Sequence, residues 1–168
     1  TVRPAGGRLE IAVERGPLPR GAPVRLRSVC VPGGLGAHKW LDRRLLDALA
    51  TAAPGELPLL VDLDGLVLEA SRANVLVLEG DALATPPLDG RILPGTTRAD
   101  VLARTGFDVR EEPIGLGRLL GADAVVLTSA LRGCEAVVAC DGRALPRPSR
   151  SERLRLQSAP AALSLEPT

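Results

Sequence analysis

The stretch "GAHKWLDRR", residues 36–44, contains the only lysine of the sequence, Lys39. Lys and Arg together number 21, and all of them except Lys39 are arginines. The two side chains carry the same charge, but only the lysine amine can lose its proton and attack a carbonyl carbon. Abundant Ala, Gly, Arg and Pro indicate a compositional bias that replaces Lys wherever charge alone matters. Lys39 is therefore either a chance survivor of that bias or a nucleophile.

A lysine that forms a Schiff base with pyridoxal phosphate needs an acid that holds the proton of the ring nitrogen. Glu69, in "GLVLEASRAN", follows apolar strand residues, where a buried carboxylate requires a partner such as that nitrogen. An edge-strand glutamate that faces water is the alternative. Arg43 lies about one helical turn after Lys39 and would favour the unprotonated amine by charge repulsion, unless it belongs to a solvated helix face.

The phosphate of such a cofactor needs hydrogen-bond donors, and two segments offer them. In "LPGTTR", Thr96 and Thr97 follow a glycine at a predicted helix N-terminus, where free N–H groups and the helix dipole favour an anion. The segment "TSALRG", residues 128–133, places small polar residues after a predicted buried strand. Capped helices and plain turns that bind nothing are the alternatives, so neither segment is specific alone.

Hydrophobic periodicity predicts the elements that position these residues in the first half of the chain. Alternation over 8–16 and 23–31 predicts two strands. Leucines at helical spacing after Lys39 predict a helix that ends at Pro54 and holds Lys39 in its first turn. Two apolar runs around Asp64–Gly65 and a second tight turn at Gly80–Asp81 predict an antiparallel meander.

The second half predicts helices between further strands. Residues 93–106 read as a helix with a threonine cap and Asp100 in its first turn. Strands are expected over 107–114, 123–129 and 134–140, with a short helical turn over 115–121, and "SRSE" offers a capping box near the end of the chain. Strands connected by helices indicate an α/β or α+β class with a mixed sheet.

Composition excludes several functions. A chain of 168 residues with 45% hydrophobic residues supports one sizeable core, and its net charge of +1 without a basic block argues against a nucleic-acid or anionic-membrane partner. Its three cysteines are odd in number and show no metal-ligand spacing, which favours a reduced cytoplasm and predicts no metal site. No signal-like or membrane-spanning apolar run is present.

Three segments taken in order resemble the class IV pyridoxal-phosphate enzymes, which include branched-chain and D-amino acid aminotransferases and 4-amino-4-deoxychorismate lyase. They are "GAHKWLDRRLL", "DGLVLEASRANVLVLEGDALATPPLDGRILPGTTR" and "ADAVVLTSALRG". The resemblance implies an α/β (mixed α+β) fold, the large C-terminal domain of fold type IV, with a mixed sheet or pseudo-barrel. It also implies three parts: 1–30 as the last strand of a small N-terminal domain and the crossover, 31–146 as the large cofactor-binding domain, and 147–168 as a C-terminal helix and tail.

The same resemblance implies a role for each candidate residue. Lys39 would form the Schiff base with pyridoxal 5'-phosphate and shuttle the proton, and Glu69 would pair with the pyridine nitrogen. The phosphate would be held by Thr96 and Thr97 and by the backbone around Ser129 and Ala130. Arg43 would contact the substrate.

Within the class, "KWLDRR" most resembles the lyase, which carries an acidic or amide residue three positions after the lysine and then an arginine, here Asp42 and Arg43. Branched-chain aminotransferases usually place a tyrosine after the lysine, and this sequence has no Tyr. The resemblance therefore implies a lyase that forms 4-aminobenzoate and pyruvate, in a homodimer that is either fused to aminodeoxychorismate synthase or works with it as a separate protein. A class IV aminotransferase and a non-catalytic large domain are the alternatives, because most of the small domain is absent from the sequence.

Overall fold

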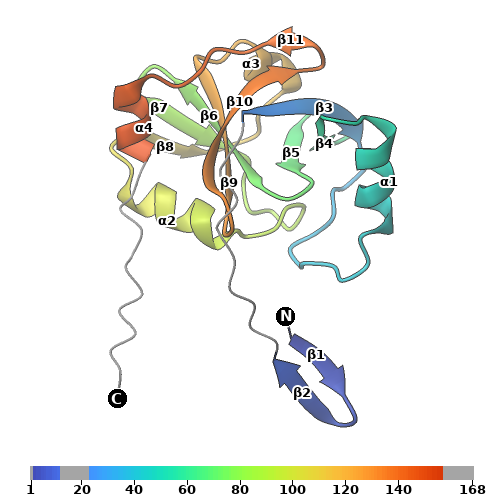
Figure 1. Cartoon of the computed structure of the whole chain (residues 1–168). Helices are drawn as coiled ribbons and strands as arrows, with labels where there is room; N and C mark the ends of the chain where they lie inside the picture. Colours follow the sequence, from blue (N-terminus) through green and yellow to red (C-terminus); the bar gives the residue numbers. More distant parts are fainter. Residues whose placement is uncertain (1, 12–22, 157–168) are drawn as a thin grey trace, which may run out of the picture.

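The computed structural model describes residues 2–11 and 23–156 (Figure 1). Strands β1 (Val2–Ala5) and β2 (Arg8–Ile11) pair as an antiparallel hairpin that forms a sheet of its own. The strand expected over 8–16 thus begins at Arg8, and its remainder from residue 12 lies outside the described residues. Within the described residues, no helix combines the length and hydrophobicity that crossing a bilayer requires.

The main sheet has nine strands and mixes parallel with antiparallel neighbours. Its order is β5-β4-β3-β10-β9-β6-β7-β8, with β11 paired to β10. The pairs β3/β4, β3/β10 and β7/β8 are parallel, and the other pairs are antiparallel. The strands are β3 (Val24–Cys30), β4 (Leu57–Val61), β5 (Val67–Ala70), β6 (Asn74–Glu79), β7 (Ala82–Thr85), β8 (Asp108–Glu111), β9 (Ala124–Ser129), β10 (Gly133–Cys140) and β11 (Arg143–Ala144). Because β3 is central in this sheet, residues 24–30 pack with the unit predicted over 31–146.

The sheet curls into a half-barrel, and the chain that follows β8 crosses back to its other edge. The N–H of Val67 in β5 donates to the Ile114 carbonyl (2.8 Å), and the Leu116 N–H donates to the Gly65 carbonyl (3.0 Å). These bonds satisfy backbone groups that the edge strand β5 would otherwise leave unpaired. The mixed α+β class and the pseudo-barrel are confirmed.

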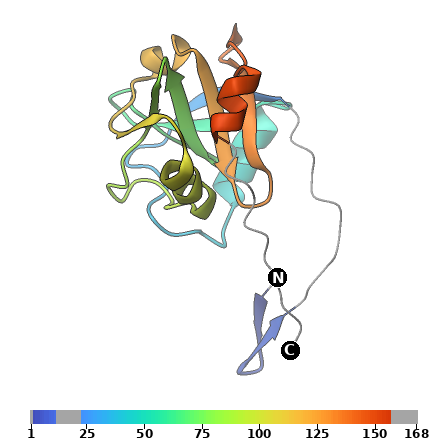
Figure 2. The same cartoon turned by 90° about the vertical axis from the view of Figure 1, so that its left-hand side faces the viewer.

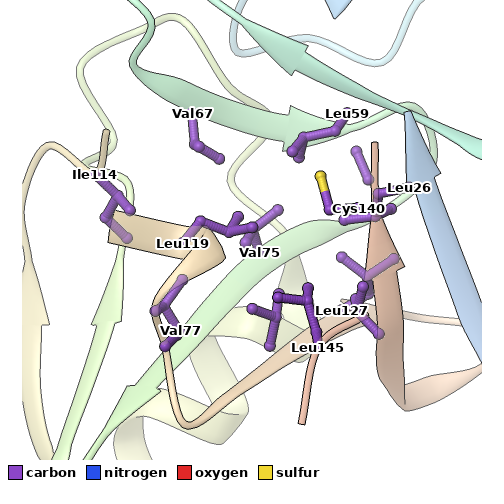
Figure 3. Packing of buried hydrophobic residues seen from close by; sticks show 14 of the residues in the cluster. Leu26, Leu59, Val67, Val75, Val77, Ile114, Leu119, Leu127, Cys140 and Leu145 are labelled. Atoms are coloured by element: carbon purple, nitrogen blue, oxygen red, sulfur yellow. The ribbon is translucent and has the colours of Figure 1, made fainter. Parts of the chain in front are cut away.

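Apolar side chains from both halves of the sheet fill the inside of the curl. Figure 3 shows Val67 and Leu59 facing Val75 and Leu127 across this space. Helix α3 (Leu116–Leu120) contributes Leu119, which is fully buried in the same cluster. Burial of such side chains, at about 1.5–3 kcal/mol each, is the main force that holds the curl together.

The other helices cover outer faces of the sheet. Helices α2 (Thr96–Arg104) and α4 (Arg150–Leu156) both lie in front of the sheet in Figure 2 and bury Val101 and Leu156 in one cluster with strands β6, β7 and β9. Helix α1 (Arg44–Ala52) packs Leu46 against β4 and β5 through a third cluster. The predicted capping box of α4 is confirmed: the Glu152 N–H donates to Ser149 Oγ (3.2 Å), and the Ser149 N–H donates to Glu152 Oε2 (2.5 Å).

The predicted position of Lys39 in a helix is wrong, because α1 begins only at Arg44. The Trp40 indole N–H donates to the Leu35 carbonyl (2.6 Å), and Asp42 Oδ1 accepts the Arg44 N–H (3.0 Å). Such local side-chain bonds to the backbone compete with helix formation. Residues before Arg44 therefore form a loop that carries Lys39.

Two further predictions need correction. The meander divides, because β6 pairs with β7 and β9 and has no ladder with β5. An isolated bridge joins Ala70 of β5 to Ala73, the residue just before β6. The threonine cap is also absent: α2 begins at Thr96 after the N-cap residue Gly95, and no side chain caps it. Asp100 consequently lies beyond the first turn of the helix.

Candidate active site

A single cavity of about 1110 Å³ opens at one end of the half-barrel and brings the candidate residues together. Its wall comes from the loop before α1, from β5 and the turn after it, from the N-terminus of α2, and from the turn between β9 and β10. Every candidate from the sequence lies on this wall: Lys39, Arg43, Glu69, Thr96, Thr97, Ser129 and Ala130.

Lys39 lies in an exposed loop at the edge of this cavity, and contacts with a second loop hold the segment before it. The Gly36 N–H donates to the Arg91 carbonyl (3.2 Å). Gly34 approaches the same carbonyl so closely, at a φ of +69°, that a Cβ there would lie 2.2 Å from the Arg91 oxygen. The close approach explains why glycine stands at residue 34.

Asp62, just after β4, anchors the loop before Lys39 and the loop of Arg91 to the sheet. Its Oδ1 accepts the N–H groups of Gly33 (3.0 Å) and Leu63 (2.8 Å), and its Oδ2 accepts from Arg91 Nη1 (2.8 Å). These donors, the backbone N–H of Gly33 first, hold the pKa of the Asp62 carboxyl below its usual range. The loop that presents Lys39 is therefore fixed by a charged residue that itself stands outside the cavity wall.

Glu69 is 7% exposed although β5 is an edge strand, so the alternative of a water-facing glutamate is wrong. Burial raises the pKa of its carboxyl to about 7, and the hydrogen bond from the Leu93 N–H to Oε2 (3.3 Å) only partly offsets this. No cationic side chain forms an ion pair with Glu69 in the part of the chain that the structure describes. A carboxyl buried in this way is stabilised by a cationic or proton-sharing partner, and the cavity is the side from which one can reach it.

The N-terminus of α2 faces the cavity without a side-chain cap, so the N–H groups of its first turn have no partner within the helix. Asn74 positions this turn: its Nδ2 donates to the Leu93 carbonyl (2.8 Å). A Cβ at Gly95 would lie 2.0 Å from Asn74 Oδ1. Asn74 stands in the motif that carries the family resemblance, but its local role was not predicted.

The role of Arg98, which holds the first turn of α2 against the end of β7, was not predicted either. It is 2% exposed, and its guanidinium donates to the Pro86 carbonyl (3.0 Å), to Glu111 Oε2 (2.8 Å) and to Thr85 Oγ1 (3.3 Å). An arginine after two threonines gives no sequence signal of burial, because charged residues are mostly exposed.

Two hydroxyl groups at the end of β9 are unsatisfied. Thr128 Oγ1 and Ser129 Oγ are buried and have no hydrogen-bond partner among the described residues, although both residues line the cavity wall. Thr128 belongs to the "TSALRG" segment but was not among the predicted binding residues. A buried polar group without a partner costs about 1–3 kcal/mol and calls for an explanation such as a ligand.

The charge on the cavity wall favours an anion. Two acidic residues, Asp42 and Glu69, face five cationic ones, and Asp42 already pairs with Arg44. Arg43 donates to the Ser71 carbonyl (3.2 Å), which ties the end of the Lys39 loop to the turn after β5. The cationic residues are Lys39, Arg43, Arg44, Arg72 and Arg132.

Comparison with known proteins places this geometry in a family. The sequence model of amino-transferase class IV matches residues 37–140. The branched-chain amino acid aminotransferase 1 of Humulus lupulus is 33% identical over 115 residues, which is 63% of this chain and 29% of the relative. A protein of Legionella pneumophila described as a 4-amino-4-deoxychorismate lyase superposes with a TM-score of 0.78 at 25% identity, over 88% of this chain and 59% of that one. The 4-amino-4-deoxychorismate lyase of Pseudomonas aeruginosa gives 0.66 at 26% identity, over 79% and 53%.

The fold is that of the fold type IV transaminases, and the half-barrel and cavity agree with it. The chain belongs to aminotransferase class IV, a family of pyridoxal-phosphate enzymes. It spans less than a third of the length of the hop relative and just over half of each of the two lyase chains.

The residues present fit this cofactor. The wall offers one primary amine at Lys39, a buried carboxyl at Glu69, and the uncapped α2 N-terminus near two hydroxyls that lack partners. An aldehyde, a ring nitrogen and a phosphate are the groups that such a set would bind.

Proposed function

We propose that the cavity binds pyridoxal 5'-phosphate and that the complete enzyme converts 4-amino-4-deoxychorismate to 4-aminobenzoate and pyruvate, a step of folate biosynthesis. The observation that supports the proposal is the meeting of Lys39, Glu69 and the α2 N-terminus on one wall, beside the unsatisfied hydroxyls of Thr128 and Ser129. Residues far apart in the sequence supply these groups, and each group matches a different part of the cofactor.

The phosphate arm would be held at the α2 N-terminus. Thr96 and Thr97 contribute first-turn N–H groups and hydroxyls, and the backbone around Ser129 and Ala130 closes the other side. Asn74 and Gly95 keep this turn against β6, so the anion site is formed before the ligand arrives.

Glu69 would hold the proton of the ring nitrogen, since its carboxyl is buried and lacks an ion partner. When bound, the cofactor supplies an electron-withdrawing ring that stabilises negative charge on the substrate carbon next to nitrogen. Glu69 would keep the ring nitrogen protonated by pairing with it. The positive charge of the nitrogen would in turn favour the ionised carboxylate of Glu69, which burial alone disfavours.

Lys39 would move the proton. Its amine takes the proton from the ring carbon that bears nitrogen, the bond from the ring to the enolpyruvyl oxygen breaks with its electron pair on oxygen, and Lys39 returns a proton to the departing fragment, which becomes pyruvate. Proton transfer by a positioned group contributes about a hundred- to ten-thousand-fold to such rates. The loop contacts of Gly34, Gly36 and Asp62 keep the amine at the cavity edge.

A class IV aminotransferase acting on branched-chain or D-amino acids is the second candidate, and the hop relative favours it. Against it stands the lack of tyrosine in this sequence. Structural likeness does not separate the two candidates, because lyases and class IV transaminases both superpose on the chain. The deciding experiment incubates the full-length enzyme with 4-amino-4-deoxychorismate, and separately with leucine or D-alanine plus 2-oxoglutarate. Release of 4-aminobenzoate supports the lyase, whereas glutamate formation without it refutes the lyase.

We propose further that the complete enzyme is a homodimer. Residues 1–30 would be the end of a small domain with its crossover, whose last part, β3, joins the sheet of the cofactor domain. Residues 31–146 would be the cofactor domain and 147–168 a tail. Trp40 and Leu131 line the cavity and are 63% and 72% exposed, and Leu41, next to Trp40 in the same loop, is 98% exposed. Such exposed apolar side chains favour a covering surface. A synthase that makes the substrate, fused or separate, would be its functional partner. If the full-length protein binds pyridoxal phosphate but shows neither activity, the non-catalytic alternative is supported.

A further inference from the structure

Two arginines flank the unsatisfied hydroxyls of β9. Arg72 lies in the turn between β5 and β6, and Arg132 lies in the turn between β9 and β10. In the sheet, Asn74 is the register partner of Thr128, and Gly133 is the partner of Ser129. Arg72 is thus two residues from the partner of Thr128, and Arg132 immediately precedes the partner of Ser129. Both arginines line the cavity.

A buried carboxylate holds both guanidinium groups. The Glu135 side chain is 1% exposed and accepts from Arg72 Nη1 at Oε2 (2.6 Å) and from Arg72 Nη2 at Oε1 (3.3 Å). Arg132 Nη1 lies 3.7 Å from Glu135 Oε1. A carboxylate buried to this degree requires compensating charge, and the two arginines supply it.

The cluster carries more positive charge than it needs for Glu135 alone. Two guanidinium groups share one carboxylate, so the cluster of Arg72, Arg132 and Glu135 carries one excess positive charge. Each guanidinium has five N–H donors, and the two side chains remain 30% and 35% exposed. Arg72 and Arg132 line this cavity and also, with Glu135 and Glu56, a second and smaller one. Donors that Glu135 does not use are therefore available to a ligand at this place, and a planar fork suits the oxygens of a phosphate or carboxylate.

We propose that Arg72 and Arg132, positioned by Glu135, bind the phosphate arm of the cofactor together with the hydroxyls of Thr128 and Ser129. The inference rests on the proposed function, because it assigns two more residues to the same cofactor site. The carboxylate of a substrate has the same chemistry as a ligand for arginine. The buried hydroxyls without partners favour the phosphate, because they supply donors beside the excess charge.

The test compares two ligands that differ only in the phosphate. Pyridoxal phosphate and pyridoxal are titrated against wild type, Arg132→Gln and the double variant Arg72→Gln/Glu135→Gln, with the fluorescence of Trp40, the only tryptophan, as the signal. The double variant removes the buried pair together, so no carboxylate is left buried with its main partner lost. Arg110→Gln is the matched control, because Arg110 pairs with Asp108 and is not part of the cavity wall.

We expect the Kd of pyridoxal phosphate to rise about tenfold or more in each arginine variant, the loss typical of a charge-assisted hydrogen bond, and to stay unchanged in Arg110→Gln. The Kd of pyridoxal should not change. Equal weakening of both ligands would overturn the inference, since it would show a purely structural role. An unchanged Kd for pyridoxal phosphate with a raised KM for a carboxylate substrate would also overturn it.

If wild type fails to bind pyridoxal phosphate, the proposed function fails, and inorganic phosphate then decides this inference separately. Weaker phosphate binding in Arg132→Gln than in Arg110→Gln would still support a phosphate site at the two arginines. Equal phosphate binding in both variants would refute it.

Discussion

Replacing Glu69 by Gln should change how the stability of the ligand-free protein depends on pH. The pKa of this carboxyl is raised from 4.5 to about 7 in the folded chain, chiefly by burial. A group whose pKa is higher in the folded state than in the unfolded state stabilises the fold most below the unfolded pKa, and this contribution is lost as the pH rises through the folded pKa. The wild-type protein should therefore lose stability between about pH 4.5 and pH 7.

The size of the effect follows from the two pKa values. A difference between 4.5 and about 7 corresponds to about 3 kcal/mol of unfolding free energy. The amide of Glu69→Gln does not titrate, so the variant lacks this loss. Relative to wild type, the variant should gain about 3 kcal/mol between pH 4.5 and pH 8.

Urea unfolding of the ligand-free protein at half-unit intervals from pH 4.5 to pH 8.5 measures this difference, since contributions common to both proteins cancel. Glu79→Gln is the matched control. Arg118 lowers the pKa of Glu79, so the contribution of that carboxyl is present above pH 4.5 and lost only on acidification. A free-energy difference between wild type and Glu69→Gln that stays constant over this range would refute the assignment of a buried, unpaired carboxyl.

The other predictions concern the hydroxyls of β9 and the loop that carries Lys39. Thr128→Val removes a buried hydroxyl without a partner, so the ligand-free protein should become more stable by about 1 kcal/mol. Its affinity for pyridoxal phosphate should fall, and thermal unfolding and cofactor titration measure the two effects. Lower stability of the variant would contradict this prediction. Gly34→Ala should cost about 2–3 kcal/mol, because the new Cβ meets the Arg91 carbonyl at 2.2 Å. Gly33→Ala, at a φ of +70° against +69° for Gly34 but in open space, should cost about 1 kcal/mol. Equal melting temperatures of the two alanine variants would show that the Gly34 contact is unimportant.

Sequence reasoning succeeded where local chemistry decides the structure. The turns at Gly65 and Gly80 have positive φ and connect strands where the sequence predicts them. The capping box of Ser149 and Glu152 is local in the same sense. The cavity also brings together every candidate residue. Each motif alone is unspecific, and only the set of motifs taken in order predicts this meeting.

What was missed depends on contacts between distant segments. Pairing of β6 with β9 is set by the whole curl, so the local pattern suggested a meander with β5. Leucine spacing extended the helix to Lys39, whereas the bond between Trp40 and the Leu35 carbonyl holds a loop there, and Leu41 is 98% exposed. The burial of Arg98 and the missing partners of Thr128 become visible only when the strands and α2 are assembled.

The central claim is that the primary amine at residue 39 reacts with the aldehyde of the cofactor, and covalent trapping tests it most directly. The protein is incubated with pyridoxal phosphate, reduced with borohydride, digested and examined by mass spectrometry, with Lys39→Arg as the control that keeps the charge but loses the amine. We predict one reduced pyridoxyl adduct, located at Lys39 and absent from Lys39→Arg. Equal labelling of both proteins, or labelling confined to the N-terminal amine, would contradict the account.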